Sequence, residues 1–513
     1  MKLIKKQVTS ERLFLLLILA IAIFLRFYNL KNTMMFQGDQ GRDAMVVANI
    51  FKNLDPVFIG PVTSIGNMYL GPFYYYFMLP FLFLSYPSPI GPVYAVAGLS
   101  VLTVFLLFQI TKKVFDRQTA ILASIFFTFS ASVVNLARFS WNPNPAPFFS
   151  LLMFYFTYLS WKKDSKYWIL VSVCFSILIQ LHYVTLLSLS GAGIIFLIQL
   201  VEKFKKSKDK FFNLENRLIK HIALAVIIFM ISLTPLLLFD YKHDFLNAKS
   251  FAKILVKEES FDLQRKKGRK GLAAFTKFIS VDLKERASLV LLEPSFAINK
   301  INHPLLFVVL ISSVIYLAKN KAKLKDGEKV LLAYLVPGII GISVYQHQVY
   351  EHYIAYLFPF TYIFYGLFFN KFKYNWLKFS LLVPFLCFFL INNMSRYTIK
   401  DSDLSIDKIK KVSEEIYARV KKNEKYNIVL LAASKDLYGM NYRYFLSTQA
   451  NEPVKIENHY LAEKLFVINE EKVEKNILNS AIYEIVVFPN KNIVETFNVT
   501  DGPEITVLTS YNE

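Results

Sequence analysis

The chain has 513 residues, of which 54% are hydrophobic and 16% aromatic, and it carries 59 Lys and Arg against 38 Asp and Glu. This apolar fraction excludes a disordered chain and predicts a polytopic membrane protein. The net charge of +21 does not indicate nucleic-acid binding, because the basic residues cluster between apolar runs, where the positive-inside bias places them. We therefore expect no nucleic-acid partner.

The N-terminal segment resembles a signal peptide, with basic residues ahead of an apolar run from Leu13 to Leu25. No small-residue cleavage site follows, so we expect it to remain as a membrane anchor. With this segment, about eleven apolar runs are long enough to cross about 30 Å of hydrocarbon. They cover residues 12–30, 91–111, 118–137, 145–161, 167–182, 184–201, 221–239, 303–318, 330–345, 353–369 and 375–392.

The charges of the short loops predict the orientation of the spans. The loops near residues 112–117, 162–166, 203–220, 319–329 and 371–373 are rich in Lys and Arg, as cytoplasmic loops are. The short turns between them, residues 138–144, 182–184 and 346–352, contain a single Lys or Arg, Arg138. We therefore expect a multi-pass protein of the cytoplasmic (plasma) membrane with its N-terminus inside.

Two long outer loops follow from this arrangement, at about residues 31–90 and 240–302. Within the first, we expect residues 40–53 to form an amphipathic helix lying on the bilayer, because Ala44, Val47, Phe51 and Leu54 share one helical face. The apolar stretch from Tyr69 to Tyr86 is read as a re-entrant or juxtamembrane element, since a further span there would invert every later loop.

The membrane character ends near residue 393. We expect residues 393–513 to form a small extracytoplasmic α/β domain and residues 1–392 to form the membrane domain. A helix is predicted at Ile406–Val420 and strands at Tyr426–Ala432, Lys464–Asn469, Ile482–Phe488 and Glu504–Thr509. The fold class is thus mainly α, a helical membrane bundle with a small α/β domain after it.

Acid–base residues stand just past the first span, in Gly38-Asp39-Gln40-Gly41-Arg42-Asp43. Two carboxylates and an arginine at a bilayer surface suggest chemistry at that place. The alternative is that Asp39 only caps the helix that follows, since Asp is a favoured N-cap residue. Capping would account for Asp39 but not for the neighbouring Arg42–Asp43 pair, so we favour a functional site.

Five of the seven histidines map to the same outer side: His182, His243, His303, His347 and His352. Each alone is more often an interfacial histidine than a functional one, but together they could bind phosphate, shuttle protons or hold a metal. Asp240 lies one helical turn from His243, which is compatible with a carboxylate that orients an imidazole. Arg138 either reaches the headgroups or binds a phosphate through its planar guanidinium.

Several short motifs, taken in order and by membrane side, resemble a known group. They are Arg26-Phe27-Tyr28-Asn29-Leu30, Gly38-Asp39-Gln40-Gly41-Arg42-Asp43, Gly71-Pro72-Phe73-Tyr74-Tyr75-Tyr76, Ala137-Arg138-Phe139-Ser140-Trp141-Asn142-Pro143 and Glu351-His352-Tyr353. Over about residues 10–395 the chain resembles a prokaryotic member of the protein O-mannosyltransferase-like glycosyltransferase family 39, in the GT-C class.

The resemblance implies an inverting transferase that moves a sugar from a polyprenyl-phosphate donor to an acceptor hydroxyl on the extracytoplasmic face. The family's essential acid corresponds to Asp39, as a general base. Gln40 stands where the family often has a second acid, so Asp43 is the candidate second carboxylate. Candidates for binding donor phosphate or substrate are Arg42, Arg138, His182, Asp240, His243 and His352.

No metal ligand set or cofactor is required by the sequence, although a divalent metal stays open, and the donor is a lipid-linked sugar in the membrane. The acceptor could be a glycan, a lipid or a protein, and the C-terminal domain either recognises it or serves as a structural cap. The alternative function is a transporter or lipid-sugar flippase that uses His and Asp at the outer face. Polar groups at span ends, rather than at mid-depth, favour the transferase.

Overall fold

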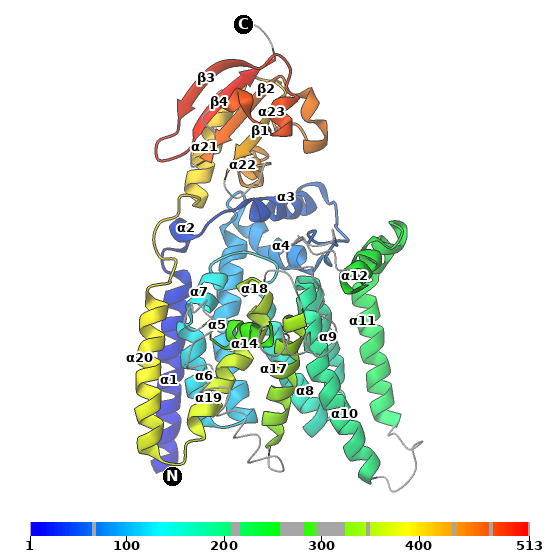
Figure 1. The fold of residues 1–513 in the computed structure, drawn as a ribbon, viewed down its shortest axis with the longest axis vertical. Helices are drawn as coiled ribbons and strands as arrows, with labels where there is room; N and C mark the ends of the chain where they lie inside the picture. Colours follow the sequence, from blue (N-terminus) through cyan, green and yellow to red (C-terminus); the bar gives the residue numbers. More distant parts are fainter. Residues whose placement is uncertain are drawn as a thin grey trace.

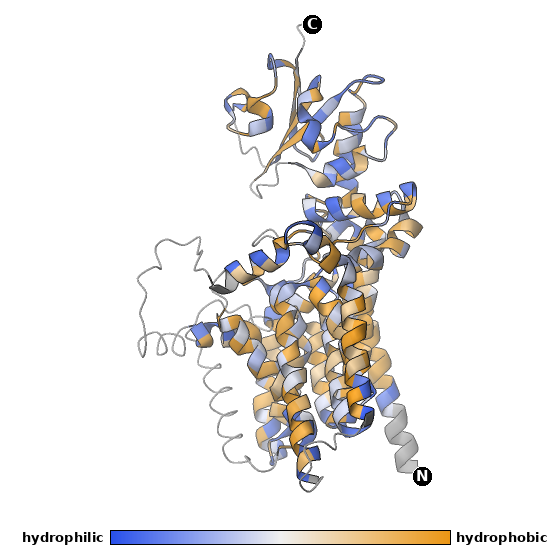
Figure 2. Ribbon diagram, turned by 90° about the vertical axis from the view of Figure 1, so that its right-hand side faces the viewer, coloured by the Kyte–Doolittle hydropathy of each residue, from blue (hydrophilic) through white to orange (hydrophobic). Residues whose placement is uncertain are grey.

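The computed structural model describes residues 2–63, 68–206, 216–256, 282–292, 294, 324–344, 349–432, 438–470 and 476–510. A bundle of long helices stands below a small α/β domain, and the two chain termini lie at opposite ends of the molecule (Figure 1). Apolar residues dominate the bundle, whereas polar residues gather at its ends and in the small domain (Figure 2).

The bundle is built from helices that coincide with ten of the eleven predicted ranges. They are α1 (Lys2–Phe27), α5 (Ile90–Val114), α6 (Arg117–Phe129), α7 (Ala131–Ala137), α8 (Ala146–Lys162), α9 (Tyr167–Leu181), α10 (Ser188–Lys206), α11 (Asn216–Lys242), α17 (Asp326–Val344), α19 (Phe358–Asn370) and α20 (Asn375–Met394). The predicted span at 303–318 lies outside the described residues.

Five helices of the described part are long and apolar enough to cross a membrane, or six if the bent pair α6–α7 is one span. The multi-pass helical architecture is therefore confirmed, and the count of eleven stays a prediction.

A bend of 60° separates α6 from α7, and a buried arginine stabilises it. Arg26 is fully buried and donates from Nη1 to Thr128 O at 3.4 Å and from Nη2 to Phe127 O at 3.5 Å. The last carbonyls of a helix lack intrahelical donors and carry partial negative charge. Arg26 therefore acts as a C-terminal cap for α6, which explains a charge inside the bundle.

Ion pairs join several predicted cytoplasmic loops at the end of the bundle that holds the N-terminus (Figure 1). Lys112 pairs with Glu11, near the chain start. Two further pairs cross between helices, Lys162–Asp326 at 2.6 Å and Lys371–Glu328 at 2.5 Å. These basic loops therefore share one side of the bundle, as their charges predicted.

The opposite end carries the first long loop, which folds into α2 (Leu30–Thr33), α3 (Gly38–Asn53) and α4 (Phe73–Ser85). The helix predicted at 40–53 is present as α3. Of its predicted apolar face, Ala44 and Val47 are buried, and the helix packs against α4 and against the small domain, whereas Leu54 is 84% exposed. Its position on the bilayer stays a prediction.

The C-terminal domain contains α21 (Ile406–Tyr417), β1 (Tyr426–Leu431), α22 (Met440–Leu446), β2 (Lys464–Asn469), α23 (Tyr483–Val486), β3 (Asn492–Asn498) and β4 (Glu504–Thr509). The sheet order is β1-β2-β4-β3, with β1 parallel to β2 and the other pairs antiparallel. The helix at 406 and three of the four predicted strands are confirmed.

The strand predicted at Ile482–Phe488 is wrong. This segment contains α23, and its buried side chains Ile485 and Phe488 are three residues apart, which is helical spacing. The fourth strand is β3, an edge strand whose apolar residues Ile493 and Val494 are exposed. Its residues do not alternate between buried and exposed as half-buried strands do, so periodicity gave no signal.

Candidate active site

Helix α3 lies between the bundle and the C-terminal domain (Figure 1) and carries both predicted carboxylates, Asp39 and Asp43, near its start. Gln37 is the N-cap residue, and its backbone N–H donates to Gln40 Oε1 at 3.2 Å. The helix start is thus closed by Gln40. Asp39 is not the N-cap residue, so capping does not account for its carboxylate.

Arg42 joins the two carboxylates. Its Nη1 donates to Asp39 Oδ1 at 2.8 Å, while its Nε and Nη2 donate to Asp43 Oδ1 at 3.0 and 2.8 Å. The carboxylates differ in access to solvent, since the side chain of Asp39 is 46% exposed and that of Asp43 is 1% exposed. The structure therefore brings Asp39, Arg42 and Asp43 into one cluster with one open and one buried acid.

Burial sets the electrostatics of this cluster. It raises the pKa of Asp43 to about 6, because removal from water disfavours the carboxylate charge and Arg42 offsets only part of that cost. Burial also disfavours the charge of Arg42, but the two neighbouring carboxylates outweigh it and raise its pKa. Among the described residues, Asp43 Oδ2 has no hydrogen-bond partner.

Tyr75 completes the cluster and was not among the site residues predicted from the sequence. Its hydroxyl donates to Asp43 Oδ1 at 3.3 Å. The neighbouring Tyr74 shares a 2.7 Å hydrogen bond with Ser140, at the bundle's outer turn. Helix α4 therefore links the carboxylate cluster to the Ser140–Trp141 turn.

A second cluster lies at that turn. The His352 ring is 4.2 Å from Trp141, 4.5 Å from Tyr353 and 6.3 Å from the His182 ring, between centroids. His182 Nδ1 accepts from Val184 N at 3.2 Å. Burial lowers the pKa of His352 to about 3, so this imidazole is neutral at pH 7. The predicted convergence of His182 and His352 is real.

Arg138 hydrogen-bonds to the segment around the end of α1. Its guanidinium donates to Leu25 O at 3.1 Å, to Tyr28 O at 3.0 Å and to the Thr33 hydroxyl. These acceptors are at the carboxyl end of α1 and in α2, and the side chain is buried. The structure thus gives Arg138 a helix-capping role like that of Arg26. Its contact with a donor phosphate stays a prediction.

Asp240 and His243 do not form the expected carboxylate–imidazole pair. Asp240 accepts the backbone N–H groups of Asn247 at 2.5 Å and Ala248 at 3.2 Å, so it caps the start of α12 (Leu246–Val256). His243 is exposed, stacks on Phe239 and forms a 2.8 Å hydrogen bond from Nδ1 to Phe239 O. The carboxylate is therefore committed to backbone donors, and any substrate role of these two residues stays a prediction.

His303 and His347 lie outside the described residues. In the part of the chain that the structure describes, no three His, Cys, Asp or Glu side chains gather closely enough to hold a metal ion.

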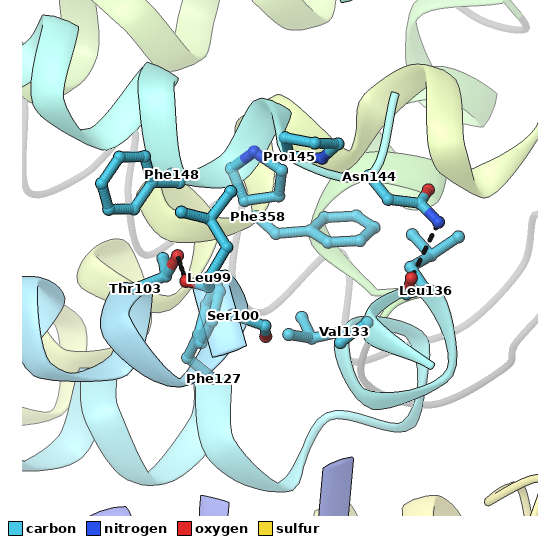
Figure 3. A pocket seen from close by; sticks show the side chains of 12 residues that line it. Leu99, Ser100, Thr103, Phe127, Val133, Leu136, Asn144, Pro145, Phe148 and Phe358 are labelled. Atoms are coloured by element: carbon cyan, nitrogen blue, oxygen red, sulfur yellow. Dashed lines mark hydrogen bonds between the residues drawn. The ribbon is translucent and has the colours of Figure 1, made fainter. Parts of the chain in front are cut away.

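A small cavity lies at the α6–α7 bend (Figure 3). Its walls are apolar apart from Ser100, Thr103 and Asn144, and Asn144 Nδ2 donates to Leu136 O at 2.8 Å. None of the predicted site residues lines it.

Comparisons with known proteins agree with this architecture. Residues 72–237 match the family model described as dolichyl-phosphate-mannose-protein mannosyltransferase, a segment that holds Arg138 and His182 but begins after Asp39. The fold is similar to that of ArnT from Cupriavidus metallidurans in the apo state, at TM-score 0.57 and 10% identity, covering 96% of this chain and 98% of that one. ArnT bound to undecaprenyl phosphate gives a TM-score of 0.57 at 11% identity, covering 96% and 97%.

No curated protein is a significant match to the sequence. The family match and the fold together confirm the predicted resemblance to the GT-C glycosyltransferases, and they do not favour the transporter or flippase alternative.

Proposed function

We propose that this chain, a membrane glycosyltransferase with a GT-C fold, transfers a sugar from a polyprenyl-phosphate donor to an acceptor hydroxyl, with inversion and with Asp39 as the general base. The observation that carries the proposal is the Arg42 bridge between an open and a buried carboxylate. ArnT, which shares the fold, has been solved with undecaprenyl phosphate, and this supports a polyprenyl-phosphate donor here.

The two acids take different roles because their exposure differs. Asp39 is half-exposed and can meet an acceptor hydroxyl, whereas Asp43 is covered and can only act through Arg42. A hydroxyl is a poor nucleophile, so a carboxylate within hydrogen-bond reach accelerates its attack by accepting the proton. Asp43 is then a positioning residue that holds Arg42.

Arg42 has donors to spare for the leaving group. A guanidinium has five N–H groups, and three of them are used by Asp39 and Asp43. The remaining two can donate to the donor's phosphate. A charged guanidinium at that place stabilises negative charge that grows in the transition state.

The proposed step balances charge within the cluster. The acceptor oxygen attacks the anomeric carbon, and the bond from that carbon to the phosphate oxygen breaks with its electron pair on the phosphate. The acceptor proton moves to Asp39, which becomes neutral, so its hydrogen bond from Arg42 Nη1 weakens. Arg42 therefore gains a free donor as the lipid phosphate gains its second negative charge.

His182 and His352 are proposed as contacts for sugar or acceptor hydroxyls rather than for phosphate. The neutral imidazole of His352 adds no positive charge, and a neutral imidazole can both donate and accept a hydrogen bond. The flanking rings of Trp141 and Tyr353 offer apolar faces for a sugar ring. The acceptor is a glycan, lipid or protein with a free hydroxyl.

The proposal places residues 1–392 in the cytoplasmic membrane, with the N-terminus inside, and residues 393–513 outside as a separate domain. The basic loops that share the N-terminal end of the bundle support this orientation. A reporter fused after Glu513 is then active only if it functions outside the cytoplasm, and cytoplasmic activity would overturn the orientation.

The catalytic proposal is tested with full-length protein in membranes supplied with a radiolabelled polyprenyl-phosphate sugar and an acceptor extract. Asp39→Asn should lose about 10² to 10⁴-fold in turnover while the protein stays folded and donor-bound. Asp55→Asn is the matched control, since Asp55 is an exposed acid just past the end of α3.

Near wild-type transfer by Asp39→Asn would refute the base assignment, and movement of the labelled lipid across the membrane without transfer would favour a flippase. We propose no metal-dependent step. Loss of activity on chelation, with recovery on adding a divalent ion, would contradict that part.

A further inference from the structure

The catalytic turn of α3 is held from above by the C-terminal domain. Phe36, three residues ahead of Asp39, donates its backbone N–H to Leu404 O at 2.7 Å. Its carbonyl accepts from Asn441 Nδ2 at 3.1 Å. Both partners belong to the C-terminal domain, so both hydrogen-bonding groups of the Phe36 backbone are occupied by a part of the chain that starts more than 350 residues later.

Packing reinforces these two bonds. The Phe36 ring is 1% exposed, and its centroid lies 5.8 Å from each of the Tyr444 and Phe445 rings of α22, in edge-on geometry. Helix α22 lies directly on α3 on the other side of Asp39. A Cβ atom on Gly41 would come within 2.3 Å of Met440 O and 2.5 Å of Asn441 N. Only glycine permits this approach.

The contacts therefore bracket Asp39. Phe36 is fixed on one side and Gly41 on the other, and both are within one helical turn of the carboxylate. We infer that the C-terminal domain is a positioning element of the active site, in which Asn441 and the Gly41–Met440 contact hold the first turn of α3 so that Asp39 faces the acceptor. This inference rests on the proposed function of Asp39.

The rest of the interface lies on neighbouring segments and keeps the domain docked when one of these contacts is lost. Lys31 pairs with Asp407 at 2.8 Å, and Ser402 N donates to Asn32 O at 2.9 Å. Tyr444 OH donates to Pro87 O at 2.9 Å, beyond the end of α4. Removal of the Asn441 bond should therefore loosen α3 locally without releasing the domain.

The chain offers a matched pair of variants for the test. Asn441→Ala removes one hydrogen bond from α22 to the α3 turn, whereas Tyr444→Phe removes one hydrogen bond from the same helix to Pro87 and keeps the ring against Phe36. Both are measured as full-length protein in lipid nanodiscs. Misplacement of a catalytic group by about 1 Å can cost about 10²-fold in rate.

We expect Asn441→Ala to lower kcat by about 10 to 100-fold with KM for donor and acceptor unchanged, and to speed amide hydrogen exchange in residues 37–45. Tyr444→Phe should change neither. Gly41→Ala provides a second route, because alanine favours the helix itself yet clashes with Met440, so a fall in kcat there reflects displacement of α3.

Wild-type kcat in Asn441→Ala would overturn the inference, as would an equal effect of Tyr444→Phe. A rise in acceptor KM with unchanged kcat would also overturn it, since the domain would then act in acceptor binding. Hydrogen exchange is independent of turnover, so it separates the two proposals. If Asn441→Ala speeds exchange at residues 37–45 while Asp39→Asn stays active, the base assignment is refuted but the C-terminal domain still holds the first turn of α3.

Discussion

Replacement of the buried carboxylate by a neutral isostere, Asp43→Asn, is expected to make the protein more stable and less active. The pKa of Asp43 rises from its ordinary 3.8 to about 6 on burial beside Arg42. At about 1.4 kcal/mol per pKa unit, the charged form costs the folded state about 3 kcal/mol. Asparagine keeps the shape of the side chain and removes that cost.

The sign of the effect follows from proton linkage. Between pH 4 and 6 the folded state binds more protons at Asp43 than the unfolded state does, so the stability that this group contributes falls as the pH rises through this range. Only well below the ordinary pKa of 3.8 do both forms of the protein hold a neutral side chain there. The stability gain of Asp43→Asn should therefore be small at pH 4 and reach about 3 kcal/mol by pH 7.

The assay is the unfolding midpoint of both proteins in one detergent from pH 4 to 7.5, with turnover measured in parallel. Turnover should fall, because Arg42 loses the anionic acceptor of its Nε and Nη2 groups. A difference in unfolding midpoint between the two proteins that does not change from pH 4 to 7.5 would refute the reasoning. A variant that is less stable at pH 7 would show that the Asp43–Arg42 pair stabilises the fold, and that the carboxylate carries no burial cost.

Three further substitutions separate structural from chemical roles. Tyr75→Phe should lower kcat by less than Asp43→Asn does, because it removes one of the three hydrogen bonds to Asp43 Oδ1, and equal losses would contradict this order. His352→Ala should raise the KM for the sugar donor or the acceptor and leave the affinity for a phosphate analogue unchanged. Weaker binding of the phosphate analogue would instead identify His352 as a phosphate contact. Arg138→Ala should lower the unfolding midpoint, since charged hydrogen bonds to Leu25 O and Tyr28 O are each worth about 1.5–3 kcal/mol. A tenfold rise in donor KM for Arg138→Ala, only partly reversed by lysine, would instead restore its predicted phosphate role.

Local patterns in the sequence were sufficient to predict the helices of the bundle and the Asp39–Arg42–Asp43 cluster. Apolar run length and loop charge depend on neighbouring residues, and Arg42 reaches both acids from within one helical turn. The different exposure of Asp39 and Asp43 was not readable, because it depends on what covers α3. Helix periodicity describes the face of α3 but not the partner that buries it.

Arg138 and Asp240 show what local patterns do not reveal. Both were read as substrate-binding because a charge at a span end is unusual. In the structure both satisfy backbone groups at helix ends, which are contacts that no sequence pattern reveals. The Asn441 contact was equally hidden, since its partner at Phe36 is 405 residues away in the chain.

That separation has a consequence for how the protein is made. Ribosomes add about 5–20 residues per second, so the 405 residues between Phe36 and Asn441 take roughly 20 to 80 s to synthesise. In the proposed orientation, the first outer loop is exported before the helix that contacts it. A late part of the polypeptide thus completes the contacts of a turn that was among the first to emerge, and we expect full transferase activity only after α22 has been exported.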